Sequence, residues 1–378
     1  MTWLAAVPAL AAAAYYLLVL VAVVQWRRPM ACMPGDGRRP SPISILKPIR
    51  GRDPEFYQAI RSHAVQDYPE FEILFGFSNP HDPAMADVAR LQTEFPDLPI
   101  FTHIVPTKAP NTKVGVLAGL ARHARHELLL VSDSDIRVEP GYLRTVAAPL
   151  AVPAVGLVTC LYRGVGKSWP SRAEALGIAT EFVPSVLVAR LLGVAEFALG
   201  STMVFRAGDL RAIGGFEAIA DYVADDYQLG ARITSLGRRV EFAPVVVETD
   251  LGGESWLETW RHQLRWSRTI RVSRPSGYYG YVVTHATLWS LVAFAFGQWW
   301  AGAAALTVRM AAGIAVAGGT LRYRPIARDW WMIPLRDLFG FAVWLAGLSG
   351  TNVYWRGRRL KLHPDGRLEP AGSTVAEL

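Results

Sequence analysis

Two aspartates that follow a short apolar run are the first candidates for chemistry. Ser132-Asp-Ser-Asp135 comes directly after residues 128–131, which are all Leu or Val. Such a run predicts a buried parallel strand, and ligands bind at the carboxyl ends of strands in open α/β sheets. Two carboxylates at that edge suit Mg²⁺ or Mn²⁺, which take oxygen ligands and recruit a substrate diphosphate. Asp133 and Asp135 are therefore candidate metal ligands, with an ordinary turn as the alternative.

A second pair of carboxylates, Asp225 and Asp226, opens the helical pattern 227–235. Acidic residues at a helix start are explained equally well by capping and by the helix dipole. If the first aspartates hold a sugar diphosphate, however, the acceptor hydroxyl needs a base, and a partly desolvated carboxylate can serve. We expect Asp226 to be this base and Asp225 to lie beside it at the acceptor.

The segment 254–274 interleaves Trp and Leu with Arg, as in an amphipathic helix suited to the lipid headgroup layer. Within it, a guanidinium from Arg265 could grip phosphate and the indole of Trp266 could bury an acceptor. A surface anchor without any role at the site is the alternative.

Two other chemistries are excluded by their missing residues. Gly164–Ser168 is similar to a phosphate-binding loop, but Leu161 stands where the first glycine belongs and no Gly-x-Gly-x-x-Gly follows a strand. Cys32 and Cys160 are the only cysteines, too few for a disulfide framework or a cysteine zinc site.

The elements that must position these residues alternate between strands and helices, which predicts an α/β fold with a mostly parallel, helix-covered sheet. Helices are expected over 53–65, 83–95 and 113–126. The expected strands are 44–48, 72–77, 100–105, 127–132 and 155–160.

Apolar segments on both sides of this block predict a membrane protein. The chain is 51% hydrophobic and 19% charged with a mean hydropathy of +0.20, and residues 3–26 carry no charge. Arg27 and Arg28 end that run, so the positive-inside rule places the following domain in the cytoplasm. The chain has a net charge of +7, and its basic residues cluster beside the apolar segments. This clustering favours a membrane surface over nucleic acid as the partner.

After residue 275 the chain becomes apolar again. We expect two spanning helices that turn near Gln298, followed by a re-entrant or interfacial segment 330–349 in which Arg336 and Asp337 are paired or face headgroups. A further span over 330–349 is the alternative. The resulting divisions are an N-terminal anchor 1–28, a cytosolic catalytic domain 41–253, an interfacial helix 254–275, a membrane region 281–350 and a basic cytosolic tail 351–378.

Several motifs, in order along nearly the whole chain, resemble the ceramide glucosyltransferase-like family of membrane glycosyltransferases. Within that family the sequence is most similar to the bacterial hopanoid-biosynthesis glycosyltransferases. The shared motifs are Ser44-Ile-Leu-Lys-Pro-Ile-Arg-Gly51, Asp67-Tyr-Pro69, His81-Asp-Pro-Ala84, Asn111-Thr-Lys113, Ser132-Asp-Ser-Asp-Ile-Arg-Val138, Gly214-Gly-Phe216, Asp225-Asp-Tyr227 and Arg265-Trp266.

The resemblance implies a Rossmann-like GT-A fold that uses a nucleotide sugar. It places Asp82 near the nucleobase or ribose, and Lys113, Asp133 and Arg265-Trp266 at the donor. One departure stands out, because His262 occupies the position where the family has Gln or Arg.

The predicted function is transfer of a single sugar, GlcNAc or glucose, from a UDP-sugar to a membrane lipid hydroxyl with inversion. A hopanoid polyol that receives GlcNAc is expected from the resemblance alone. The alternatives are a ceramide or diacylglycerol glucosyltransferase, a processive polysaccharide synthase, and a membrane-anchored module that binds a nucleotide sugar without turnover. The expected location is the bacterial inner membrane, and the sequence predicts no oligomeric state.

Overall fold

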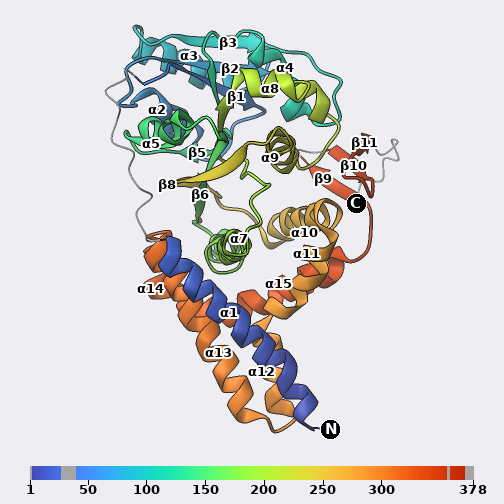
Figure 1. Cartoon of the computed structure of the whole chain (residues 1–378). Helices are drawn as coiled ribbons and strands as arrows, with labels where there is room; N and C mark the ends of the chain where they lie inside the picture. The colour runs from blue at the N-terminus through green and yellow to red at the C-terminus, as the bar shows by residue number, and fades with distance from the viewer. Residues whose placement is uncertain (1, 27–39, 356–357, 371–378) are drawn as a thin grey trace. The chain divides into compact units, whose positions relative to one another are not determined.

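The computed structural model describes residues 2–26, 40–355 and 358–370 of the 378-residue chain. It forms two units, and Figure 1 shows the elements of each. The sheet unit comprises Ala31–Tyr162 and Ala195–Gly252, and the helical unit comprises Met1–Met30, Arg163–Val194 and Gly253–Leu378. Arg27 and Arg28, on which the predicted orientation depends, lie outside the described residues.

The sheet unit contains an eight-stranded sheet in the order β3-β2-β1-β4-β7-β6-β8-β5. Neighbouring strands among the first four are parallel, whereas the β4–β7, β7–β6 and β8–β5 pairs are antiparallel. The predicted α/β class and the five predicted strands are thus confirmed. The strands are β1 (Ile43–Ile49), β2 (Phe71–Phe77), β3 (Ile100–Ile104), β4 (Leu128–Val131), β5 (Ile136–Arg137), β6 (Val155–Val165), β7 (Met203–Arg206) and β8 (Arg239–Asp250).

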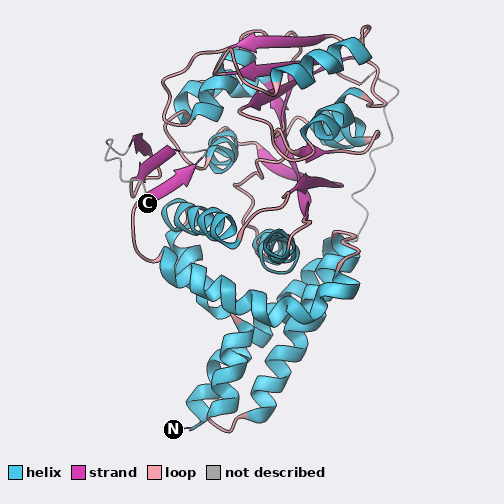
Figure 2. Ribbon diagram, turned by 180° about the vertical axis from the view of Figure 1, so that it is seen from behind, coloured by secondary structure: helices cyan, strands magenta, loops and turns pink. Residues whose placement is uncertain are grey.

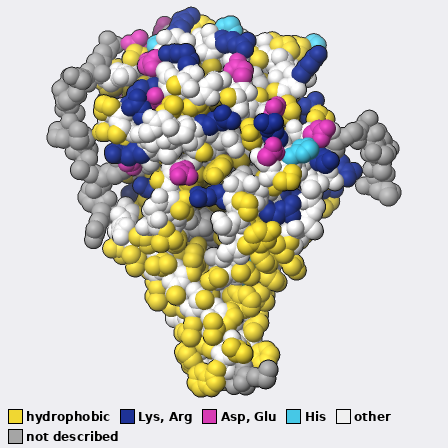
Figure 3. Space-filling model, turned by 45° about the vertical axis from the view of Figure 1, so that its right-hand side comes forward, with side chains coloured by type: hydrophobic (Ala, Val, Ile, Leu, Met, Phe, Trp, Pro, Cys, Tyr) yellow, Lys and Arg dark blue, Asp and Glu magenta, His cyan; other side chains and the backbone are white. Residues whose placement is uncertain are grey.

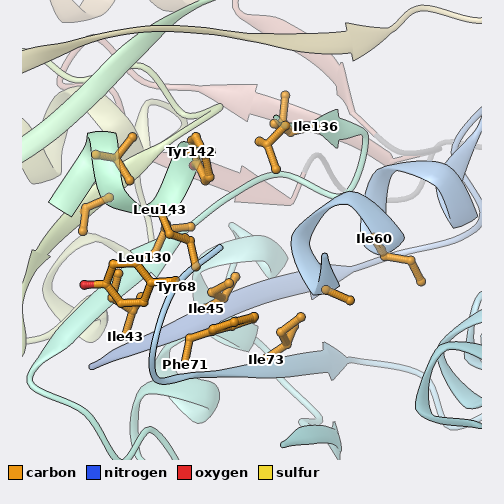
Figure 4. Close-up of a cluster of buried hydrophobic side chains, with 14 of the residues drawn as sticks. Ile43, Ile45, Ile60, Tyr68, Phe71, Ile73, Leu130, Ile136, Tyr142 and Leu143 are labelled. Carbon is orange, nitrogen blue, oxygen red and sulfur yellow. The ribbon is translucent and has the colours of Figure 1, made fainter. Parts of the chain in front are cut away.

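Helices cover both faces of this sheet (Figure 2), so every residue of β1, β2 and β4 is buried. One face packs against three helices, where Ile43, Ile45 and Leu130 meet Ile60 and Leu143 (Figure 4). The opposite face packs against three other helices. The helices of the first face are α2 (Phe56–Ala64), α3 (Met85–Glu94) and α5 (Tyr142–Ala147); those of the second are α4 (Thr112–Ala121), α8 (Ala207–Ala212) and α9 (Asp225–Ser235).

The helical unit is built around α1 (Ala6–Trp26), α12 (Ala286–Ala295) and α13 (Trp299–Ile314). Small residues line their contacts, which lets the helix backbones approach closely. The fully buried members of this alanine cluster include Ala9, Ala293, Ala301 and Ala305.

The outward surface of these three helices is apolar. Figure 3 shows hydrophobic side chains covering it on the visible face, and Trp3, Leu4, Phe296 and Trp299 are each more than half exposed. Trp3–Trp26 and Trp299–Thr320 are long and apolar enough to cross a membrane. The α12–α13 turn includes Gln298, as the sequence predicts, but the 10 residues of α12 are too few for the spanning helix expected before that turn.

The segment 330–349 contains α15 (Ile333–Gly347), whose 15 residues are fewer than the roughly 20 that a straight crossing needs. Asp337 of this segment is paired with Arg309 of another helix, α13. Asp337 Oδ1 and Oδ2 accept hydrogen bonds from Arg309 Nε of α13 at 3.1 and 3.0 Å, and both side chains are buried. This ion pair lies between helices rather than within one.

Arg336, the other charge of that segment, is also buried and paired. Its Nη2 donates to Gln263 Oε1 at 2.9 Å and lies 3.3 Å from Glu181 Oε2. The sequence predicted that these charges pair or face headgroups, and the described residues show that both pair, with different helices rather than with each other.

Two segments differ from the predicted divisions. Arg163–Val194 belongs to the helical unit, so it interrupts the domain expected over 41–253. It forms α6 (Trp169–Gly177), a π-helical turn η3 (Ile178–Phe182) and α7 (Val183–Leu191).

The expected basic tail contains a three-stranded antiparallel sheet of β9 (Asn352–Trp355), β10 (Arg358–Leu362) and β11 (Leu368–Pro370). Alternating burial places Leu360 and Leu362 inside and the basic side chains outside. The amphipathic helix, α10 (Trp256–Ser273), reaches this segment through Arg268 Nη1, which donates to the carbonyl of Asn352 at 2.5 Å. The run of arginines and lysine obscured this two-residue alternation in the sequence.

The buried Arg309–Asp337 pair generates a stability prediction. Replacing Asp337 with Asn leaves the Arg309 charge buried without a counter-ion, which costs about 3–5 kcal/mol. We expect the variant to unfold at much lower SDS fraction in mixed micelles. Asp365→Asn is the control, because its pair with Arg367 is more than half exposed and contributes less than about 1 kcal/mol. Equal unfolding midpoints for the two variants would contradict the assignment.

Candidate active site

The predicted donor residues lie at the carboxyl edge of the parallel strands. Asp82 follows β2, and both of its oxygens accept backbone hydrogen bonds, Oδ2 from Gly51 N at 2.7 Å and Oδ1 from Ala84 N at 3.0 Å. Gly51 follows β1 and has a φ of 73°, a conformation that favours glycine. Asp82 thus connects the loops that follow β1 and β2. The predicted contact of Asp82 with a nucleobase or ribose remains a prediction.

Lys113 joins the two carboxylate motifs that the sequence singled out. Its Nζ lies 2.8 Å from Asp133 Oδ1 and 3.1 Å from Asp225 Oδ2. Lys113 is in the first turn of α4, where Asn111 caps the helix by accepting from the Val114 N–H. Burial lowers the pKa of Lys113, but the two neighbouring aspartates outweigh it, so the pKa lies above its ordinary value and the ammonium stays charged.

Asp226 is held by backbone donors on both of its carboxylate oxygens. Gly200 N donates to Oδ2 at 3.0 Å and Tyr227 N donates to Oδ1 at 2.8 Å. Burial, followed by repulsion from Asp225, raises the pKa of Asp226 to about 6. The group is therefore ionised at neutral pH yet basic enough to accept a proton from a reacting hydroxyl.

Gly200 marks the point where these side chains converge. A β-carbon added there would lie 3.5 Å from Asp226 Oδ2, 3.5 Å from Lys113 Nζ and 3.7 Å from Asp133 Oδ2. The absence of a side chain at Gly200 leaves a cradle bordered by two carboxylates and an ammonium. The sequence reading did not single out this glycine, since only the fold brings the loop before β7 to the end of β4.

Asp135, two residues after Asp133, accepts a hydrogen bond from Thr249 Oγ1 of β8. Burial and the adjacent Asp133 raise the pKa of Asp135 to about 6. Two neighbouring carboxylates form a donor set that fits Mg²⁺ or Mn²⁺. The assignment of Asp133 and Asp135 as metal ligands remains a prediction.

Lys47 is a site residue that the sequence reading missed. It lies on β1 with its side chain fully buried, and Nζ donates to Ser132 Oγ at 3.3 Å and to the carbonyl of Asp133 at 2.9 Å. The feature of the sequence that could have identified Lys47 is a single charged residue inside an otherwise apolar strand. Burial lowers the pKa of Lys47 to about 7, against the attraction of Asp135 and Asp133. Ser132 Oγ also lies 3.3 Å from His63 Nε2.

Arg265 and Trp266 belong to the helical unit, where α10 gives them local partners. The Arg265 guanidinium lies 5.6 Å from the centre of the Trp355 ring, and Trp266 packs against Phe182 and His262. The predicted contacts of Arg265 and Trp266 with donor and acceptor remain predictions.

A mostly parallel sheet with aspartates at the carboxyl edge of its fourth strand defines a GT-A-type glycosyltransferase fold. A mannosyltransferase from Pyrobaculum calidifontis, solved with GDP-Man and Mn²⁺, shares this fold. The two align with a TM-score of 0.55 at 20% identity, over 91% of this chain and 97% of that one.

The chain belongs to glycosyl transferase family 21, whose model matches residues 1–368. It is 30% identical over 200 residues to ceramide glucosyltransferase 1 of Caenorhabditis elegans, which covers 52% of this chain and 42% of the relative. It is also 32% identical over 115 residues to a ceramide glucosyltransferase of Candida albicans, which covers 27% of this chain and 21% of the relative. The chain thus spans less than half the length of these curated relatives.

Lys47 generates a prediction about pH. Its folded pKa of about 7 lies below the ordinary 10.5, so between these values the unfolded chain holds a proton that the folded chain lacks. Stability from this group therefore rises with pH above 7, by up to about 1.4 kcal/mol per pH unit, and is flat below 7. We expect the unfolding free energy of wild type relative to Lys47→Met to rise between pH 7 and 9.5.

The measurement is denaturant unfolding of the full chain in detergent at several pH values. Lys361→Met serves as the control, because Lys361 is exposed and its removal leaves this pH profile unchanged. Parallel profiles for wild type and Lys47→Met would show that Lys47 is not a desolvated charge.

Proposed function

We propose that this protein is an inverting glycosyltransferase that transfers one sugar from a UDP-sugar to the hydroxyl of a membrane lipid. The convergence of Asp133, Lys113 and Asp226 on the cradle beside Gly200 carries the proposal. It gathers one carboxylate of the predicted metal pair, a cation for the leaving group and a base for the acceptor. With Asp226 as the base we expect a single displacement, which inverts the anomeric centre.

Asp226 accepts the proton of the acceptor hydroxyl while its two backbone donors keep the carboxylate oriented. Lys113 adds positive charge at the donor side and holds Asp225 beside the base. A Mg²⁺ or Mn²⁺ ion held by Asp133 and Asp135 would neutralise charge on the departing diphosphate.

The acceptor is a lipid in this proposal, supported by the apolar surface of the helical unit and by the names of the curated relatives. A hopanoid polyol that receives GlcNAc is the acceptor and sugar we favour, because the ordered motifs resemble hopanoid-biosynthesis enzymes. A ceramide or diacylglycerol that receives glucose is the second candidate, supported by the ceramide glucosyltransferase relatives.

We infer that Trp3–Trp26 and Trp299–Thr320 cross the bacterial inner membrane, with the sheet unit on the cytoplasmic side. This orientation gives the sheet unit access to cytosolic UDP-sugars. The lipid would then be glycosylated in the cytoplasmic leaflet. One N-terminal anchor and one helical hairpin are few for a polymer tunnel, which disfavours a processive synthase.

Asp226→Asn is the central test of this function. The amide keeps the shape of the side chain but cannot accept the proton, so we expect transfer to fall by about 10²–10⁴-fold. UDP affinity, measured by calorimetry with Mn²⁺, should stay within about threefold of wild type. Labelled product should be a single-sugar lipid that extracts into organic solvent, whereas a long water-soluble polymer would identify a processive synthase.

Asp221→Asn is the matched control, because Asp221 is an exposed aspartate four residues before the start of α9. It should leave both transfer and UDP binding unchanged. Undiminished turnover in Asp226→Asn would show that Asp226 is not the general base. Tight UDP-sugar binding with no product from any lipid in the wild type would favour the binding-module alternative.

Helix α10 generates a prediction about acceptor use. Trp256 and Leu257 are more than half exposed near its start, whereas Trp260 is partly buried against Phe339. Replacing Trp256 and Leu257 with Glu should weaken docking on a bilayer. We expect transfer to a bilayer-embedded acceptor to fall at least tenfold while transfer to a short-chain soluble analogue changes less than twofold. Equal losses would show that this part of α10 serves the fold or the donor.

A further inference from the structure

A second cluster of ligand-type side chains lies in the helical unit, apart from the aspartates assigned to catalysis. Glu174 of α6, Glu254 just before α10 and His262 within α10 each bring one possible ligand atom into the same group. These three atoms lie within 4.8 Å of one another. The two glutamates are 80 positions apart in the numbering of the chain, so only the fold brings them together.

Two buried atoms of this cluster lack hydrogen-bond partners among the described residues. The Glu174 side chain is fully buried, and its Oε2 has no donor. His262 Nδ1 lies 2.7 Å from Glu174 Oε1, yet it also has no partner with hydrogen-bond geometry. Buried polar atoms are normally satisfied, because an unpaired one costs the full desolvation of the group. A cation between these atoms would satisfy both at once.

One imidazole faces two carboxylates in this cluster, and His262 Nδ1 lies 2.7 Å from Glu174 Oε1. Arg336, the nearby base, is engaged with Glu181 and with the Gln263 amide rather than with Glu174.

Outer hydrogen bonds hold the ligand side chains in place. Gln263 Nε2 donates to Glu174 Oε1 at 3.2 Å, and its amide is oriented by Arg336 Nη2 at 2.9 Å. Thr259 Oγ1 donates to Glu254 Oε2 at 3.5 Å. Such partners orient the ligands of protein metal sites.

We propose that Glu174, Glu254 and His262 bind a divalent transition metal, with Zn²⁺ the best fit, and that this ion fastens α6 to the start of α10. One imidazole with two carboxylates is a ligand set that zinc accepts, and it leaves a position for water. Tetrahedral bonds of about 2.1 Å would place ligand atoms about 3.4 Å apart. The ligand atoms lie within 4.8 Å of one another, and His262 Nδ1 is 2.7 Å from Glu174 Oε1, so binding requires side-chain rotations at both contacts.

The Ser168 Oγ to Glu254 carbonyl hydrogen bond, at 2.9 Å, already joins the start of α6 to the start of α10. The ion would strengthen the same junction on a helix that carries Arg265 and Trp266.

The test uses the full chain in detergent with Asp133→Asn and Asp135→Asn, so that the predicted donor metal site is disabled. Zn²⁺ is titrated calorimetrically into this metal-stripped protein, and one equivalent is expected to bind and to raise the thermal unfolding midpoint. Adding Glu174→Gln or His262→Gln should weaken binding at least 100-fold and remove the midpoint shift. Co²⁺ should show visible absorption bands that these two variants lose.

Glu217→Gln is the matched control, because Glu217 is an exposed glutamate paired only with the exposed Arg122 among the interactions described. It should bind Zn²⁺ as its parent does. If Glu174→Gln fails to fold, His262→Gln decides the question, since His262 is partly exposed. Absence of Zn²⁺ binding in the parent, or unchanged binding in both variants, overturns the proposal and indicates that a shared proton holds the two glutamates.

Discussion

The candidate active-site edge of the sheet unit depends on the ion pairs of one partly buried lysine. Asp133 follows β4, whereas Asp225 and Asp226 begin α9, and their negative charges repel one another. Lys113 pairs with Asp133 and Asp225, and backbone N–H groups bind Asp226. Burial, followed by repulsion from Asp225, raises the pKa of Asp226. This environment leaves one carboxylate with the basicity that proton transfer needs.

Lys47 supports the same edge of the sheet from the neighbouring strand β1. It is buried in β1 and donates hydrogen bonds to Ser132 and Asp133 at the end of β4. These bonds hold the loop that carries Asp133 and Asp135, the predicted metal ligands. A buried ammonium is costly, and its lowered pKa measures that cost. Burial of the Lys47 ammonium therefore lowers the stability of the fold locally while its hydrogen bonds position the loop after β4. Such local losses of stability are common at functional sites.

The helical unit solves a different problem, because it buries charges among apolar helices. Arg309 is paired with Asp337 and Arg336 with Glu181, and alanines elsewhere let α1, α12 and α13 pack closely. Isolated charges in such surroundings would be strongly destabilising. In the cluster of Glu174, Glu254 and His262, one imidazole lies against two carboxylates, and this ligand set is the basis of the metal proposal.

Sequence alone determined the α/β class, most strand positions and the aspartates of the site, because apolar periodicity and short motifs are local properties. Tertiary structure decided what depends on distant residues. It placed Gly200 between Asp133 and Asp226, gave Asp337 its partner Arg309, and moved 163–194 into the helical unit. It also folded the basic C-terminal segment into strands. The contacts of Gly200 and of Asp337 join residues tens of positions apart, and no local pattern encodes which residues will meet.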